Sequence, residues 1–258
     1  MSLLPPWIRP LGPLVIADLR RRYAGSLLGG LWAVLAPLLE AVIYGVVFAW
    51  ILGASARTRM PYAVLIASGL FPWASFREGL EGCASVLSDN RWIRRSRVPV
   101  ELLVARLVVA ALPRALVALA VIYGFALVSG SRPTVLGWSA PLVALCLQLL
   151  GAYGLGLLVA PAATLLPDLR PTLTSLMTLL TFAAPILYPE SIAAGALATL
   201  LRLNPFTHLL RLYRAPIEPL SWETALLSVG VGCAAVLGAL AAGRLARAGL
   251  WWRARDAL

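Results

Sequence analysis

Long apolar stretches separated by short polar segments dominate this chain of 258 residues. A helix that crosses a bilayer needs about 20 mostly apolar residues. Six stretches approach this length, the fifth being the shortest: 27–52, 62–87, 107–128, 138–163, 173–188 and 225–245. We therefore expect an all-α integral membrane protein with six transmembrane helices, folded as a single domain over residues 1–258.

The N-terminal segment, residues 1–26, is too polar to cross the membrane. Within it, residues 12–24 set apolar Leu14 and Leu19 against Asp18 and a run of three arginines. This pattern is typical of an amphipathic helix that lies on the cytoplasmic surface of the membrane.

Residues 189–219, between the fifth and sixth spans, are too apolar for a free loop and too interrupted to cross. Asn204-Pro205 breaks the segment near its middle. Non-helical backbone at membrane depth must be buried in protein or line a water-filled cavity. We therefore expect a re-entrant or interfacial helical pair here that faces a conduit through the membrane domain.

The distribution of arginine predicts the orientation of the chain. All 22 basic residues are arginine. Thirteen fall on the side shared by both termini: Arg9, Arg20, Arg21, Arg22, Arg91, Arg94, Arg95, Arg97, Arg170, Arg244, Arg247, Arg253 and Arg255. Six fall on the opposite side: Arg57, Arg59, Arg132, Arg202, Arg211 and Arg214. Because cytoplasmic loops are the arginine-rich ones, we expect both termini on the cytoplasmic side of a bacterial inner membrane.

Composition excludes several classes of function. The chain has no lysine, and a P-loop needs one to reach the nucleotide phosphates, so no nucleotide site of its own is expected. The arginines lie between apolar stretches rather than on one basic face, which argues against nucleic-acid binding. Three cysteines and the single His208 lack metal-ligand spacing, so neither a metal site nor a cofactor is predicted.

The predicted cytoplasmic loop 88–99 begins with helix-capping residues and ends at Pro99, which indicates a short basic helix. Its arginines alone could simply enforce orientation. An apolar pair flanked by arginine is, however, typical of a docking surface for another protein. The residues that we expect to contact a partner are Asp89, Arg91, Trp92, Ile93, Arg94 and Arg95.

The residues 18–37, DLRRRYAGSLLGGLWAVLAP, resemble the entrance motif of ABC-2-type permeases that export capsular polysaccharide, O antigen or teichoic acid. Five further strings follow in the order of that family: 69–73 (GLFPW), 97–99 (RVP), 166–170 (LPDLR), 185–189 (PILYP) and 203–206 (LNPF). Together they cover most of the chain.

The resemblance implies a homodimer of six-span subunits with two copies of a cytoplasmic ABC ATPase docked beneath it. ATP and Mg²⁺ would be bound by that ATPase, and residues 89–99 would be the coupling helix seated in it. The implied substrate is a lipid-linked polysaccharide, with capsule polysaccharide favoured and O antigen next, that passes through a channel between the two permeases. Membrane lipids and periplasmic or outer-membrane export proteins are further candidate partners.

Aromatic rings in or beside the spans are candidates for lining that channel, because sugar rings stack on them through their C–H faces. The candidates, with one arginine that could face an anionic glycan, are Tyr44, Phe71, Trp73, Phe76, Tyr188 and Arg114. The alternative is that the aromatic residues belong to interfacial belts, which form whatever a protein transports, and that Arg114 extends to the interface.

Other polar or small residues within the spans suggest local packing. Arg77 and Glu81 are spaced i, i+4 and should pair on one helix face, whereas Glu40 and Arg114 have no evident local partner. Glycines clustered at 151–156 should let helices approach closely, without indicating which ones.

Three other classes of function remain as alternatives. An intramembrane transferase would need clustered histidine or acidic residues, but the 11 carboxylates are scattered and no G-x-S-x-G string occurs, so no catalytic residue is predicted. A secondary transporter should show repeated halves and acidic residues at mid-membrane depth, which only Glu40 approaches. An ABC-2 exporter of small hydrophobic molecules or drugs is the nearest alternative to a glycan exporter.

Overall fold

The computed structural model describes residues 10–22, 25–51, 60–89 and 99–256. Every regular element in these ranges is a helix, which confirms the predicted all-α class for this part of the chain. The elements are α1 (Leu11–Arg22), η1 (Gly29–Leu31), α2 (Trp32–Ile51), α3 (Tyr62–Asp89), α4 (Val100–Ala110), α5 (Leu112–Val128), α6 (Val135–Leu165), α7 (Leu169–Phe182), η4 (Glu190–Ile192), α8 (Gly195–Leu203), α9 (Pro205–Arg214), α10 (Trp222–Gly249) and α11 (Trp251–Asp256).

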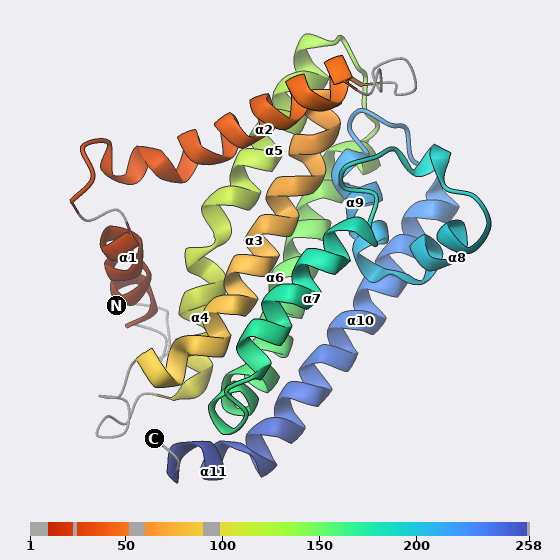
Figure 1. Cartoon of the computed structure of the whole chain (residues 1–258). Coiled ribbons are helices and arrows are strands. Elements are labelled where there is room, and N and C mark those ends of the chain that lie inside the picture. The colour runs from red at the N-terminus through yellow and green to blue at the C-terminus, as the bar shows by residue number, and fades with distance from the viewer. Residues whose placement is uncertain (1–9, 23–24, 52–59, 90–98, 257–258) are drawn as a thin grey trace, which may run out of the picture.

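Helix α6 is the centre of the bundle and packs against α3, α4, α9 and α10 (Figure 1). Its contact with α10 depends on glycine. A Cβ on Gly154 would lie 2.7 Å from the backbone of Ala239 and Leu240, and one on Gly243 would lie 2.5 Å from the Gly154 carbonyl oxygen. Small residues of this kind let transmembrane helices approach to backbone contact.

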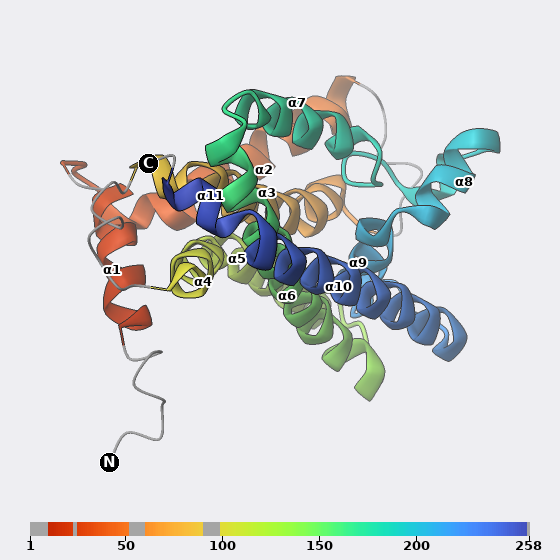
Figure 2. The same ribbon diagram turned by 90° about the horizontal axis from the view of Figure 1, so that it is seen from below.

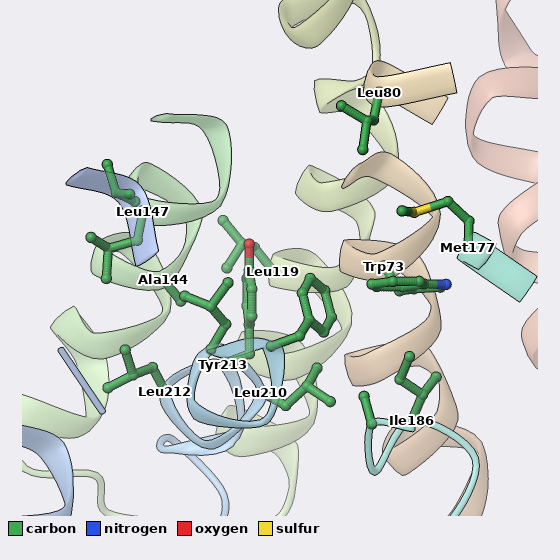
Figure 3. Packing of buried hydrophobic residues seen from close by; sticks show 14 of the residues in the cluster. Trp73, Leu80, Leu119, Ala144, Leu147, Met177, Ile186, Leu210, Leu212 and Tyr213 are labelled. Atoms are coloured by element: carbon green, nitrogen blue, oxygen red, sulfur yellow. The ribbon is translucent and has the colours of Figure 1, made fainter. Parts of the chain in front are cut away.

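The largest apolar cluster lies where α3, α5, α6, α7 and α9 meet, with Trp73 beside Met177 and with Tyr213 fully buried (Figure 3). A chain of hydrogen bonds crosses this cluster. The Tyr213 hydroxyl donates to Gln148 Oε1 at 3.0 Å, and Gln148 Nε2 donates to the Pro72 carbonyl at 3.1 Å. Helices α9, α6 and α3 are thereby joined by polar contacts in an otherwise apolar core.

The two ends of the bundle gather different parts of the chain. The last turn of α3, the first turn of α4, the α6–α7 junction, α1 and α11 lie at one end (Figures 1 and 2). The first turn of α3, the α5–α6 connection, α8 and α9 lie at the other end (Figure 1). The segments predicted to be cytoplasmic thus flank one end, here called the inner end, and the opposite one is called the outer end. Which of them faces the cytoplasm stays a prediction.

Three helical stretches in the described ranges are long and apolar enough to cross a bilayer: Val100–Val128, Val135–Leu165 and Trp222–Gly249. They occupy the third, fourth and sixth predicted spans. Helices α2 and α3 occupy the first and second, although α2 lies across the bundle at a steep angle (Figure 1). The count of six crossings stays a prediction.

The helical stretch at the third predicted span begins at Val100, ahead of the predicted start at residue 107. The predicted span leaves out the charges of Glu101 and Arg106, and both have partners on other helices. Arg106 pairs with Asp18 of α1 at 2.9 Å, and Glu101 pairs with Arg247 of α10 at 2.6 Å. Paired charges can lie within such a helix.

Helix α7 ends at Phe182, ahead of the predicted end of the fifth span at residue 188. Pro185 and Pro189 lie in the turns that follow, and proline disfavours further helix. This turn packs tightly on α3, since a Cβ added to Gly69 would lie 3.1 Å from Ile186 Cα. Helix α7, at the fifth predicted span, is consequently shorter than a bilayer-spanning helix needs to be.

Residues 189–219 form η4, α8 and α9, with the Asn204-Pro205 break at the junction of α8 and α9. The Asn204 side chain caps α9 by accepting from the Phe206 amide at 2.9 Å, and it donates to the Ala183 carbonyl at 2.9 Å. Most of α9 is buried, whereas Leu201 is the buried residue of α8. Whether this pair re-enters the membrane stays a prediction.

Candidate functional site

A hollow of about 820 Å³ lies between α2, α3, α5 and α7. We call it the charged groove, because its walls combine ionisable, threonine and aromatic side chains: Glu40, Leu70, Trp73, Ala74, Arg77, Glu78, Glu81, Gly82, Arg114, Thr178, Thr181, Phe182 and Leu187. In a chain with only 13% charged residues, five ionisable side chains on one hollow are a marked concentration. Charges inside membrane proteins usually face a partner or a water-filled cavity.

Three ion pairs organise the groove. Arg114 Nε lies 3.0 Å from Glu78 Oε2, and Arg114 Nη1 lies 3.9 Å from Glu40 Oε2. The expected Arg77–Glu81 pair is present at 2.8 Å. These side chains are partly exposed, between 24% for Glu78 and 44% for Glu40. The groove is therefore open to its surroundings, and its charged side chains can contact polar molecules.

The sequence predicts no evident local partner for Arg114 and Glu40, and the structure pairs Arg114 with Glu40 and Glu78 from other helices. That expectation considered only neighbours on the same helix. The three side chains come from α5, α3 and α2, and only the folded bundle brings them together. Arg114 is therefore not a side chain that merely extends to the membrane surface.

Helix α7 contributes hydroxyl groups that sequence reasoning missed. Thr181 accepts a 2.8 Å hydrogen bond from the Trp73 indole and donates to the Met177 carbonyl at 3.0 Å. Thr178 is exposed on the same wall and donates to the Thr174 carbonyl at 3.0 Å. Three threonines at positions 174, 178 and 181 lie on one helical face, and this spacing is the signal that could have revealed them.

The predicted channel residues separate in the structure. Trp73 and Arg114 line the charged groove. Phe76 lies in an aromatic cluster, 5.8 Å from the rings of both Trp73 and Phe206. Phe71 is fully buried in the core.

Two further channel candidates are not among the described residues of the groove wall. Tyr188 is half-buried after α7, and its hydroxyl donates to the Phe182 carbonyl at 2.9 Å. Tyr44 belongs to α2, but its side chain lies outside the described residues. Neither residue is therefore placed on the groove wall by the structure.

The predicted coupling residues fall in a segment that the structure does not describe. Asp89 is the last residue of α3, with its side chain outside the described set, and Arg91, Trp92, Ile93, Arg94 and Arg95 lie wholly outside it. The flanking helix ends are described. The end of α3 and the start of α4 lie at the inner end, near α1 and α11 (Figure 2). A docking role for this segment stays a prediction.

Helix α1 is anchored to the bundle by one buried ion pair. Arg106 of α4 is 3% exposed and Asp18 of α1 is 13% exposed, with 2.9 Å between Arg106 Nε and Asp18 Oδ2. Such a pair orients two helices, because removing one partner leaves a buried charge uncompensated. Movement of α1 at the inner end can therefore be transmitted to α4.

A second polar cluster lies at the outer end, around α9. The Arg214 guanidinium is buried and donates to Ser68 Oγ at 3.0 Å, to the Leu65 carbonyl at 3.2 Å and to the Pro185 carbonyl at 2.9 Å. Arg211 forms a two-pronged ion pair with Glu190, and this hydrogen bonding lowers the pKa of Glu190 below its ordinary value. These two arginines are thus engaged within the fold rather than free in a solvated loop.

His208 lies beside this cluster and serves the packing of α9. Its ring nitrogens lie 3.3 Å from Ser228 Oγ and 3.0 Å from the Arg202 carbonyl oxygen. Among the residues that the structure describes, no group of three or more histidine, cysteine or acidic side chains is placed to hold a metal ion.

Comparison with known proteins gives the family. The ABC-2 type transporter family model matches residues 13–217, well over half of the chain. The chain is 32% identical over 208 residues to the O-antigen export system permease protein RfbA of Myxococcus xanthus, covering 78% of this chain and 77% of that protein. It is 27% identical over 200 residues to a protein of the same name from Klebsiella pneumoniae, covering 76% and 75%. The chain belongs to the ABC-2 type transporter family.

Proposed function

We propose that this protein is the permease subunit of an ATP-driven exporter that moves a lipid-linked polysaccharide across the bacterial inner membrane. ATP hydrolysis is supplied by a separate ATPase subunit, and two copies of the permease form the conduit. The observation that carries this proposal is the charged groove, a hollow with five ionisable side chains in a chain that is 60% hydrophobic.

The lining of the groove suits a sugar chain. Paired carboxylates and guanidinium groups, threonine hydroxyls and one indole offer hydrogen bonds and an apolar face without a single strong attachment point. Conduction needs contacts that are weak enough for release. Sequence reasoning placed capsule polysaccharide ahead of O antigen. The relatives carry the O-antigen name, which favours an O-antigen-like glycan.

A second copy of the chain would complete the groove. Helices α2 and α7 border it and carry exposed apolar side chains, among them Val42, Ile43 and Val46 on α2 and Leu179 and Phe182 on α7. These faces can pack against a symmetry-related subunit. In this arrangement the two grooves face each other and form one pathway between the permeases.

The ATPase would dock at the inner end, where the end of α3, the start of α4, α1 and α11 gather (Figure 2). Replacing Trp92 and Arg94 together with alanine should uncouple ATP hydrolysis from export while leaving membrane insertion intact. Export at the wild-type rate by this double variant would refute the docking assignment.

An exporter of small hydrophobic molecules is the second candidate, and one observation favours it. An apolar hollow of about 370 Å³ lies between α3, α6, α7, α9 and α10, with Trp73, Phe76 and Phe206 on its wall. Its size is in the range of small-molecule sites. The charged groove has more than twice this volume and a polar wall, which is why we place the glycan first.

The experiment is complementation in a strain that lacks its own O-antigen permease, with the cognate ATPase co-expressed. We expect surface glycan to return and the purified complex to hydrolyse ATP, whereas the permease alone does not hydrolyse it. Persistent hydrolysis by the permease alone would contradict the division of labour. Stimulation of the complex by hydrophobic drugs, without restored glycan, would favour the second candidate.

A further inference from the structure

A second polar pocket, separate from the charged groove, lies at the outer end of the bundle. It has a volume of about 390 Å³ and is enclosed by η4, α9, the first turns of α3 and the residues before α10. We call it the outer pocket. Its ionisable side chains are Glu190, Arg211, Arg214 and Glu218, and Pro185, Pro189 and Pro219 supply apolar faces.

The outer pocket contains a buried hydroxyl for which the described residues supply no hydrogen-bond partner. Thr207 of α9 lines the pocket and is fully buried, and its Oγ1 has no hydrogen-bond partner among the residues that the structure describes. Threonine in a helix often donates to a carbonyl one turn back, as Thr178 and Thr181 do in α7. Buried polar groups are nearly always paired, so this hydroxyl points to a partner that enters the pocket.

The guanidinium groups of the pocket retain free hydrogen-bonding capacity. Arg214 uses Nε and Nη2 for three bonds to the protein, and Nη1 takes no part in these bonds. Arg211 Nε donates to Glu190 Oε2 at 2.9 Å, and this pair forms part of the wall. A ligand in the pocket would meet both donors and acceptors.

The balance of charge indicates what kind of ligand fits. Two guanidinium groups face two carboxylates, so a phosphate or sulfate would meet Glu190 and Glu218 as well as the arginines. A neutral ring with several hydroxyl groups can donate to the carboxylates, accept from the guanidinium groups and bond to Thr207. Its C–H face can rest on the proline rings.

We infer that the outer pocket binds a single sugar unit of the exported glycan as that glycan leaves the membrane. This inference rests on the proposed function, because it assumes that a sugar chain reaches the outer end. The outer pocket is lined by Leu65 in the first turn of α3, whereas the charged groove begins further along α3 at Leu70, so the outer pocket follows the charged groove on an outward path. The pocket would slow backward sliding by holding the unit that has already emerged.

Binding is tested with methyl glycosides of six-carbon sugars on the full-length permease in lipid nanodiscs, by saturation-transfer NMR. We expect saturable binding by the wild-type protein and binding about fivefold weaker in Thr207→Val, because one hydrogen bond is lost. Glu218→Gln should weaken binding as well. The matched control is Thr172→Val at the inner end, which removes an exposed threonine hydroxyl and should change nothing.

Thermal unfolding of the same variants without sugar gives an independent readout. Because no described residue bonds to the Thr207 hydroxyl, Thr207→Val should unfold at the wild-type temperature or above it. A clear drop would show that the hydroxyl serves packing and would overturn the inference. So would wild-type protein that binds none of the glycosides, equal binding by Thr207→Val, or competition by inorganic phosphate.

The complementation experiment separates this inference from the proposed function. Restored surface glycan with no glycoside binding would remove the outer pocket assignment and leave the export function standing. Glycoside binding without restored glycan would count against the export function and leave the outer pocket standing as a sugar-binding site.

Discussion

Replacing Gly154 or Gly243 with alanine tests the contact that holds α6 against α10. The new Cβ on residue 154 would lie 2.7 Å from Ala239 C and Leu240 N, and the one on residue 243 would lie 2.5 Å from the Gly154 oxygen. These are backbone atoms and cannot rotate away. Since carbon atoms pack at about 3.5–4.0 Å, the helices would have to separate by about 1 Å.

The expected loss of stability follows from this separation. Overpacking of a well-packed core costs about 1–3 kcal/mol, and α6 has more contact with α10 than with any other described helix. For a chain of this size we expect each variant to unfold about 5 °C below the wild-type protein. The nine tryptophans provide the fluorescence signal for a thermal unfolding measurement in detergent.

The matched control is Gly151→Ala, one turn earlier on α6. The nearest atom to its new Cβ is Val236 Cγ2 at 3.8 Å, an ordinary contact, so no loss is expected. The double variant of Gly154 and Gly243 should lose less than the sum of the single losses, because one displacement relieves both clashes. Equal unfolding temperatures for Gly154→Ala and Gly151→Ala would refute the described helix crossing.

Three further predictions concern the ion pairs. Arg114→Gln should reduce export at least tenfold and cost about 1 kcal/mol of stability, because it removes the ion pairs of Arg114 with Glu78 and Glu40 in a partly exposed groove. Arg114→Lys should retain part of the activity, as surface glycan measurements would show. Arg106→Gln should destabilise the fold by about 3 kcal/mol through the loss of its buried pair with Asp18, and exchanging the two residues should restore part of the loss in thermal unfolding; no recovery would argue against direct pairing. The pKa of Glu190 is lowered from its ordinary 4.5, chiefly by its hydrogen bond to Arg211, so its stabilising effect is present above pH 4.5 and is lost as pH falls through the lower folded value. The difference in unfolding temperature between wild type and Glu190→Gln should accordingly be constant from pH 8 to about 5 and shrink in more acidic buffer.

The helical class and the family could be predicted from the sequence because they depend on local information. Runs of apolar residues and the break at Asn204-Pro205 are properties of neighbouring positions, and the described helices follow them closely. The glycines at 151–156 predicted a close helix approach, but their partner Gly243 lies on α10 and could not be chosen from spacing alone.

The walls of the candidate sites could not be predicted, because they depend on contacts between helices that are far apart in the sequence. Arg114 meets Glu78 and Glu40 from two other helices, and Arg214 meets Ser68 across the bundle at the outer end. Side chains that look unpaired in the sequence are paired only after helices pack. The buried hydroxyl of Thr207 has no sequence signal, because only the packed structure shows that the described residues leave it without a hydrogen-bond partner.

The pattern of anchoring indicates which helices can move during transport. Helix α6 is fixed to α10 by backbone contact and to α3 and α9 by the bonds of Gln148. Helix α7 buries only Leu173 and Met177 within its own length, and one hydrogen bond from Trp73 to Thr181 joins it to α3. Displacing α7 therefore gives up far less buried surface than separating α6 from α10, because stabilisation scales with the area removed from the surrounding solvent and with close packing. A pathway between two copies of this chain would accordingly widen by movement of α7, with the α3–α6–α9–α10 assembly as its rigid support.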